Sequence, residues 1–101
     1  MPWIDSYEFD DDFQDFRINP EGVTFWADRI LAEVAPGHPL HGRDWSVVAK
    51  YHPQDEVVVR YGAEVALVHL TFTQTPPERS AWPSTTFFAS ADEFQAHFEH
   101  R

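Results

Sequence analysis

No cysteine occurs in the 101 residues, and the four glycines stand singly along the chain. Without cysteine there is no disulfide framework, no zinc finger of the usual kind and no catalytic thiol. Without a glycine-rich turn there is no loop of backbone amides to cradle a phosphate. These absences argue against thiol enzymes, disulfide-rich domains and proteins that bind nucleotides through the familiar glycine motifs, and we predict no cofactor.

Basic side chains are also scarce. Seven Lys and Arg stand against 17 Asp and Glu, which gives a formal charge of −10 with neutral histidines. Nucleic acids and anionic membranes would both repel such a chain, so neither is expected as a partner. No apolar run approaches the roughly 20 residues that span a bilayer. Met1 precedes Pro2 and acidic residues, whereas a secretory signal begins with basic ones, and this favours a cytoplasmic protein.

The chain does contain enough apolar and aromatic residues to form one domain over residues 1–101. Hydrophobic residues make up 43% of the sequence and aromatic residues 16%, and disordered chains lack that much apolar surface. The charge is uneven, because residues 1–33 carry nine carboxylates against two arginines and are net −7, whereas the remainder is net −3. The first third of the chain is therefore its most distinctive part.

Residues 1–18 combine this acidity with aromatic rings. Phe9, Phe13 and Phe16 recur at the spacing of one helical face, but aspartate disfavours the interior of a helix. The segment is predicted to dock onto the body, in helical or extended form, or else to remain a flexible tail. Residues 20–101 are predicted to form the folded body.

The main helix is predicted over residues 20–34, with a start as late as Thr24 as the alternative, because Gly22 lowers the helix preference of the first turn. Asn19 suits the N-cap, Pro20 suits the first helical position, and Glu21 suits the positive end of the helix dipole. Arg29 and Glu33 fall on the polar face, four residues apart, where they can pair weakly. The apolar stripe comprises Val23, Trp26, Ala27, Ile30, Leu31 and Val34.

A second helix is predicted at the carboxyl end. Ser90 and Glu93 form a capping-box pattern, in which each side chain bonds the other residue's backbone amide. Phe94 and Phe98 are four residues apart and share the inner face.

Between the helices, alternating and β-branched residues predict strands at 45–52, 56–61 and 65–73, with a short fourth strand at 85–89. Short turns join the first three strands, which therefore form an antiparallel meander. The predicted fold class is α+β, a three- or four-stranded antiparallel sheet packed on one main helix, with the second helix at the carboxyl end.

Six histidines raise the question of a metal site. Weak candidate ligands are His38 and His41 in a proline-rich loop, and Glu93, His97 and His100 on one face of the terminal helix. No HExxH motif is present, and a polar loop and an exposed helix end explain both groups more simply. We therefore assign no metal ligand from the sequence.

His69 is the weak candidate for a catalytic base. It shares a strand face with Leu67 and Thr71, and imidazole is the side chain that titrates near neutral pH. No serine lies in a GxSxG or SxxK motif that would supply a nucleophile. A hydrogen-bonded structural histidine is the favoured interpretation, and no catalytic residue is assigned.

The candidate binding residues are acidic or aromatic. Asp10, Asp11, Asp12 and Asp15 provide the densest negative charge, for which the simplest explanation is a solvated face. Trp82 stands next to a proline in a loop, where it either covers the open edge of the sheet or serves as an exposed binding anchor.

The carboxyl half resembles a group of small bacterial proteins of uncharacterised function over roughly residues 24–95. These share a GHPL loop, a VVHLTW-like strand and a P-x-T-x-F-F segment before a terminal helix. Phe72 stands where the group has Trp, and the acidic segment lies outside the similarity. The resemblance implies a bacterial origin and a shared fold but no activity. The corresponding segments here are Gly37-His38-Pro39-Leu40, Ala66-Leu67-Val68-His69-Leu70-Thr71-Phe72 and Trp82-Pro83-Ser84-Thr85-Thr86-Phe87-Phe88.

Taken together, these features favour a non-catalytic, acidic protein-interaction domain that binds a basic partner, for example as an immunity-like or inhibitor-like protein. The alternative is a small hydrolase or metal-dependent enzyme that uses His69. Self-association through a strand edge or the Trp82 loop is a third possibility.

Overall fold

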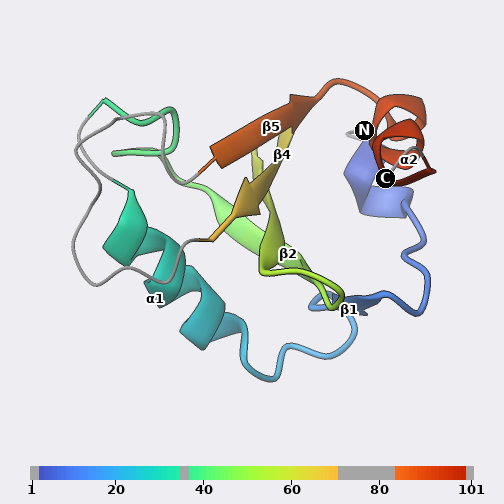
Figure 1. Ribbon diagram of the computed structural model, residues 1–101, viewed down its shortest axis with the longest axis horizontal. Coiled ribbons are helices and arrows are strands. Elements are labelled where there is room, and N and C mark those ends of the chain that lie inside the picture. Colours follow the sequence, from blue (N-terminus) through green and yellow to red (C-terminus); the bar gives the residue numbers. More distant parts are fainter. Residues whose placement is uncertain (1–2, 35–36, 71–83, 100–101) are drawn as a thin grey trace.

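The computed structural model describes residues 3–34, 37–70 and 84–99, which form one five-stranded sheet and two α-helices (Figure 1). The strands pair antiparallel in the order β1-β2-β3-β4-β5, so neighbours in sequence are neighbours in the sheet. In the described ranges, no helix is long and apolar enough to cross a membrane. The elements are the 3-10 helix η1 (Trp3–Ser6), β1 (Phe13–Asp15), α1 (Val23–Glu33), β2 (Ser46–Tyr51), β3 (Glu56–Tyr61), β4 (Glu64–His69), β5 (Ser84–Phe88) and α2 (Ala91–Glu99).

The α+β class, the antiparallel meander and the terminal helix are confirmed. The strand number was underestimated, because a fifth strand forms within the acidic segment. Phe13 pairs with Tyr51 and Asp15 pairs with Ala49, which adds β1 to the free edge of β2. Three residues containing an aspartate carry too little β-propensity to be recognised in the sequence. The helical spacing of Phe9, Phe13 and Phe16 was therefore misleading.

Both faces of the sheet are covered, by different elements. In Figure 1, α1 lies on one side of the sheet, whereas η1 and α2 lie side by side on the other. The core on the α1 side contains Ile30, Val34, Leu40, Val57, Val59, Ala66, Val68 and Leu70. The core on the α2 side contains Ile4, Val48, Ala49, Val58, Val65, Leu67, Phe88 and Phe94. Residues of β4 therefore alternate between the two cores, with Val65 and Leu67 on the α2 side and Ala66 and Val68 on the α1 side.

An irregularity in β2 changes which of its residues face each helix. Val47 pairs with Val59 and Ala49 pairs with Val58, so Val48 is the extra residue of a bulge. Strict alternation would have put Val47 and Tyr51 on one face. The bulge instead directs Tyr51 toward the α2 side and buries Lys50 under α1, where its ammonium lies 4.9 Å from the Trp26 ring centre.

The main helix differs from the prediction at its start and in its buried face. It begins at Val23, with Gly22 at the N-cap in the left-handed conformation (φ 85°), rather than at Pro20. Leu31 is 62% exposed, whereas Glu33 is fully buried and its carboxylate accepts a hydrogen bond from Arg29 Nε at 3.1 Å. At 100° per residue, Leu31 lies well outside the narrow stripe that faces the sheet.

The Ser90 half of the predicted capping box of α2 is confirmed, whereas the Glu93 carboxylate bonds the amide of Ala89 instead of that of Ser90. The Ser90 hydroxyl accepts a hydrogen bond from the Glu93 amide at 3.2 Å, and the Glu93 carboxylate accepts one from the Ala89 amide at 2.8 Å. This cap fixes the start of α2 directly after β5. As a result, the helix turns back across the sheet face that carries Phe88.

Candidate functional site

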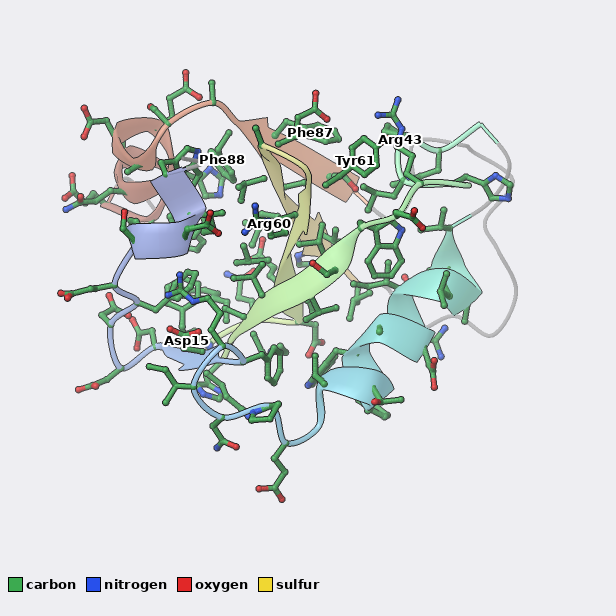
Figure 2. The ribbon with its side chains drawn as sticks, turned by 180° about the vertical axis from the view of Figure 1, so that it is seen from behind. Asp15, Arg43, Arg60, Tyr61, Phe87 and Phe88 are labelled. Atoms are coloured by element: carbon green, nitrogen blue, oxygen red, sulfur yellow. The ribbon has the colours of Figure 1, made fainter. Side chains whose placement is uncertain are left out.

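Arg17 links different parts of the acidic segment through hydrogen bonds. Its guanidinium donates hydrogen bonds to the carbonyls of Ile4 and Tyr7 and to both carboxylate oxygens of Asp15, at 2.8 and 2.7 Å. It also lies 5.0 Å from the ring centre of Phe9. This fork of hydrogen bonds holds the pKa of the Asp15 carboxyl below its usual value. A second ion pair, between Asp5 and Arg60 of β3, joins the segment to the sheet (Arg60 is labelled in Figure 2).

The aromatic rings of the segment pack against Phe94, the fully buried phenylalanine of α2. The Phe94 ring centre lies 5.6 Å from Trp3, 5.1 Å from Tyr7 and 6.0 Å from Phe9. Aromatic pairs at these separations add stabilisation beyond simple burial. The acidic segment is thus docked in mostly extended form, which is one of the alternatives that the sequence left open.

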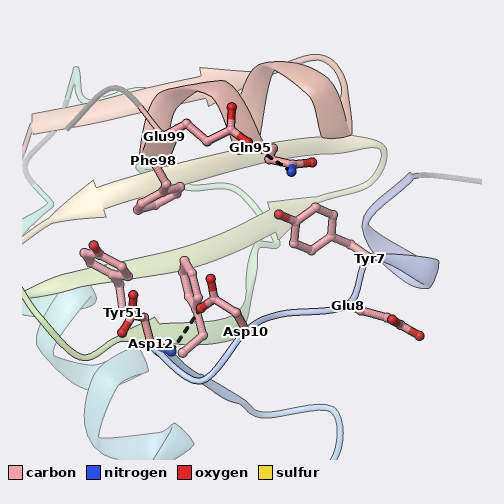
Figure 3. A pocket seen from close by; sticks show the side chains of 9 residues that line it. Tyr7, Glu8, Asp10, Asp12, Tyr51, Gln95, Phe98 and Glu99 are labelled. Atoms are coloured by element: carbon pink, nitrogen blue, oxygen red, sulfur yellow. Dashed lines mark hydrogen bonds between the residues drawn. The ribbon is translucent and has the colours of Figure 1, made fainter.

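A hollow of about 360 Å³ opens where this docked segment, β2 and the end of α2 meet (Figure 3). In Figure 3 the Tyr7 hydroxyl and the Asp10 carboxylate point toward the middle of the hollow, under Phe98, whereas Glu8 points away. None of the described residues that line it is Lys or Arg. The lining residues are Tyr7, Glu8, Asp10, Asp12, Phe13, Tyr51, Gln95, Phe98 and Glu99.

Local hydrogen bonds set the acidic side of the hollow. The Asp10 carboxylate accepts a hydrogen bond from the Asp12 amide at 2.9 Å, which forms a tight turn. The Asp12 carbonyl accepts a hydrogen bond from the His52 amide at 2.7 Å. On the opposite side, the Glu99 carboxylate accepts one from the Gln95 side-chain amide at 3.2 Å. Carboxylates from the two ends of the chain are thereby fixed around one space.

The negative charge affects Tyr7 directly. Burial, with the charges of Asp10 and Glu99, raises the pKa of the Tyr7 phenol above its usual value of 10.0. The unfolded chain therefore releases this proton before the folded protein does. Tyr7 consequently lowers the free energy of unfolding as pH rises above 10.0.

We expect the double variant Asp10→Asn and Glu99→Gln to lower the pKa of Tyr7 while leaving it above 10.0, because burial is the largest cause of the shift. The measurement is an NMR titration of the Tyr7 ring resonances in both proteins. An unchanged pKa would show that the two carboxylates do not lie beside Tyr7 in solution. Glu64→Gln, at an exposed position outside the lining, is the control.

The structure places the candidate binding residues from the sequence in different surroundings. Asp10 and Asp12 line the hollow, whereas Asp11 is exposed outside it. Asp15 is engaged by Arg17, and Trp82 lies outside the described residues. Sequence reasoning missed the other polar residues of the lining, which share no motif, namely Tyr7, Glu8, Tyr51, Gln95 and Glu99.

His38 is a structural histidine. It is buried, and its Nδ1 accepts a hydrogen bond from the Leu40 amide at 3.1 Å, so the neutral ring carries its proton on Nε2. That nitrogen lies 3.2 Å from the Thr85 hydroxyl. The ring thus joins the 37–43 loop to β5. His41, by contrast, is exposed.

In the second set of candidate metal ligands, the described residues make contacts unrelated to a metal site. Glu93 caps α2, His97 packs its ring 5.4 Å from that of Phe88, and His100 lies outside the described residues. In the part of the chain that the structure describes, no group of three or more His, Asp or Glu residues is placed to hold a metal ion.

His69 belongs to a row of residues that crosses the sheet. Its register partner is Glu56, whose own partner on β2 is Tyr51, and Tyr51 in turn pairs with Phe13. The buried Glu56 carboxylate lies 3.7 Å from His69 Nδ1, which is beyond hydrogen-bond distance. His38 lies with Thr85 on the α1 face, so the sheet separates it from His69. These imidazoles do not converge on one site.

A second exposed surface contains aromatic side chains at the far end of the β3–β4 hairpin (Figure 2). Tyr61 and Phe87 are 39% and 46% exposed, and the Arg43 guanidinium lies 5.3 Å from the Tyr61 ring centre. Self-association through a strand edge or the Trp82 loop stays a prediction, and Trp82 lies outside the described residues.

Comparison with known proteins supplies no family. The resemblance of the carboxyl half to a group of small bacterial proteins also stays a prediction, and Trp82 and Pro83 of its third segment lie outside the described residues. No family model matches the chain, and no match was found among curated proteins or among solved structures.

Proposed function

We propose that this protein is a non-catalytic binding protein for a basic protein partner. The docking surface would be the acidic face formed by the docked segment and the end of α2. The observation that carries the proposal is that Asp10, Asp12 and Glu99 line one hollow, with no Lys or Arg among the described residues of its lining. An inhibitor that covers the basic active site of another protein is one version. We propose the cytoplasm as its compartment, because a chain without cysteine gains nothing from an oxidising one.

Charge complementarity supports this choice of partner. With a net charge of −10, the protein would attract a basic surface over distances comparable with the Debye length, which is about 8 Å at physiological salt. Such attraction raises the association rate and disfavours acidic partners. The docked segment is held by Arg17 and by the aromatic rings around Phe94, so the carboxylates are presented with little loss of conformational entropy on binding.

The proposal is tested with a fluorescein-labelled peptide of alternating lysine and serine, measured by fluorescence anisotropy. We expect the peptide to bind at low salt, with an affinity that falls as salt rises. The triple variant Asp10→Asn, Asp12→Asn and Glu99→Gln should bind about tenfold more weakly, because three exposed charge interactions of about 0.5 kcal/mol each are lost. Asn and Gln retain the oxygen atoms that accept the local hydrogen bonds.

The matched control is the triple variant Glu21→Gln, Asp28→Asn and Glu64→Gln, which removes the same number of charges from exposed positions outside the hollow. We expect it to weaken binding by less than about twofold. Equal losses in both variants would mean that only net charge matters, and absence of binding by the lysine peptide would also contradict the proposal. Circular dichroism establishes that both variants fold.

A further inference from the structure

The hollow contains aromatic rings as well as carboxylates. Tyr7 comes from the segment after η1, Phe13 from β1, Tyr51 from β2 and Phe98 from α2, so four parts of the chain contribute rings to one lining. Its volume of about 360 Å³ lies within the range of roughly 300–1,000 Å³ that is common for small-ligand pockets. Rings attract a cation through their electron-rich faces, and carboxylates attract it by charge. Acidity alone would not define a ligand, but this combination fits an organic cation.

The angles between the rings favour one kind of organic cation. Phe13 and Tyr51 are inclined at 48°, Tyr51 and Phe98 at 51°, and Phe13 and Phe98 at 81°, with centroids between 4.8 and 5.2 Å apart. Because the rings are inclined to one another, a planar guanidinium could lie flat against one of them at most. An ammonium is a compact charge with three rotatable donors and needs no such slot.

We propose that the hollow receives one lysine-type primary ammonium group, carried by a side chain of the basic partner. The inference rests on the proposed function and names the chemical group that this surface selects. The alkyl stem would lie along the rings of Tyr51 and Phe98, and the ammonium would donate hydrogen bonds toward Asp10 and Glu99.

The Tyr7 hydroxyl provides a further acceptor. It points toward the middle of the hollow (Figure 3), and in the described ranges it has no hydrogen-bond partner. The phenol is protonated at neutral pH, as its ordinary pKa of 10.0 already requires, and its oxygen can still accept a hydrogen bond from the ammonium. A neutral acceptor beside two carboxylates matches the three donors of a primary ammonium.

The test is a titration of isotope-labelled protein with N-acetyl-lysine methylamide, followed by NMR. The comparison ligands are N-acetyl-arginine methylamide, which carries a guanidinium, and N-acetyl-norleucine methylamide, which keeps the apolar stem without the charge. We expect saturable shifts at Tyr7, Tyr51 and Phe98 with the lysine compound, weaker binding of the arginine compound and none of the norleucine compound.

Variants separate the rings from the charges. Phe98→Leu retains apolar volume but removes one ring, and we expect it to weaken lysine binding about three- to fivefold. Asp10→Asn with Glu99→Gln removes charge without altering packing, so it tests the site even if Phe98→Leu folds poorly. Phe87→Leu, at an exposed position outside this hollow, is the ring control and should leave binding unchanged.

The outcomes distinguish this inference from the proposed function. If the lysine–serine peptide binds through the acidic face but the lysine compound produces no saturable shift in the hollow, the inference fails and the proposed function stands. Equal binding of the arginine or norleucine compound would likewise overturn the selectivity for an ammonium. If the peptide itself does not bind while the lysine compound fills the hollow, the proposed function fails and the hollow remains an ammonium site.

Discussion

Replacing Phe94 with alanine is expected to lower the free energy of unfolding by about 4 kcal/mol, because the substitution leaves a cavity where a fully buried ring stood. Phe94 contacts rings from the docked segment, from β5 and from its own helix, including Tyr7 at 5.1 Å and Phe88 at 5.2 Å. A domain of this size has a total stability of roughly 5–15 kcal/mol. Urea denaturation followed by tryptophan fluorescence measures the loss.

The control for this substitution is Phe25→Ala. Phe25 lies on the outer side of α1 and is 58% exposed, so its removal should change the free energy of unfolding by no more than about 0.5 kcal/mol. If both substitutions cost the same, Phe94 would not be the residue around which the segment packs. If Phe94→Ala does not fold, Phe94→Leu provides a milder cavity at the same position.

The second large effect is expected from Arg17→Ala, which should lower the free energy of unfolding by about 2 kcal/mol. The substitution removes hydrogen bonds to the carbonyls of Ile4 and Tyr7 and leaves Asp15 without its cation. The loss should be concentrated at the amino end, so amide hydrogen exchange of residues 4–9 should accelerate while β3 and β4 keep their protection.

The dependence on pH gives Arg17→Ala a distinct signature. Because the pKa of Asp15 is lowered in the folded protein, its ion pair with Arg17 adds fully to the free energy of unfolding above pH 3.8, the ordinary pKa. This contribution is lost as pH falls through the lowered pKa. The stability difference between the wild-type protein and Arg17→Ala should therefore narrow below pH 3.8. Arg17→Lys keeps the charge but not the fork of donors and should recover part of the stability. Equal exchange rates in residues 4–9 of the wild-type protein and Arg17→Ala would contradict the role assigned to this side chain.

Much of the fold could be predicted because its patterns are local. The alternation in β4 and the Ser90 cap of α2 depend on residues within a few positions of one another, and both are confirmed. The β2 bulge and the burial of Glu33 could not be predicted in this way. Each depends on how an element meets a partner that is distant in the sequence, namely β3 for the bulge and the sheet for α1.

The candidate site, like the fold, could be predicted only where its residues are close together in the sequence. Asp10 and Asp12 stand out in the sequence as an acidic run, but nothing near them indicates that Glu99 and Tyr51 complete the hollow. Glu99 lies at the hollow because the acidic segment docks on α2, and Tyr51 lies there because the β2 bulge turns its side chain to this face. The aromatic residues among the aspartates were the available sequence signal that the acidic segment packs onto the rest of the protein, because leaving aromatic rings exposed to water costs free energy.

The most direct test of the account is a nuclear Overhauser measurement between the ring protons of Tyr7 and Phe94, whose centroids lie 5.1 Å apart. The account predicts cross-peaks between these two rings, with dispersed chemical shifts for residues 3–12. Random-coil shifts in that segment, without cross-peaks to α2, would contradict it, because the hollow could not then exist.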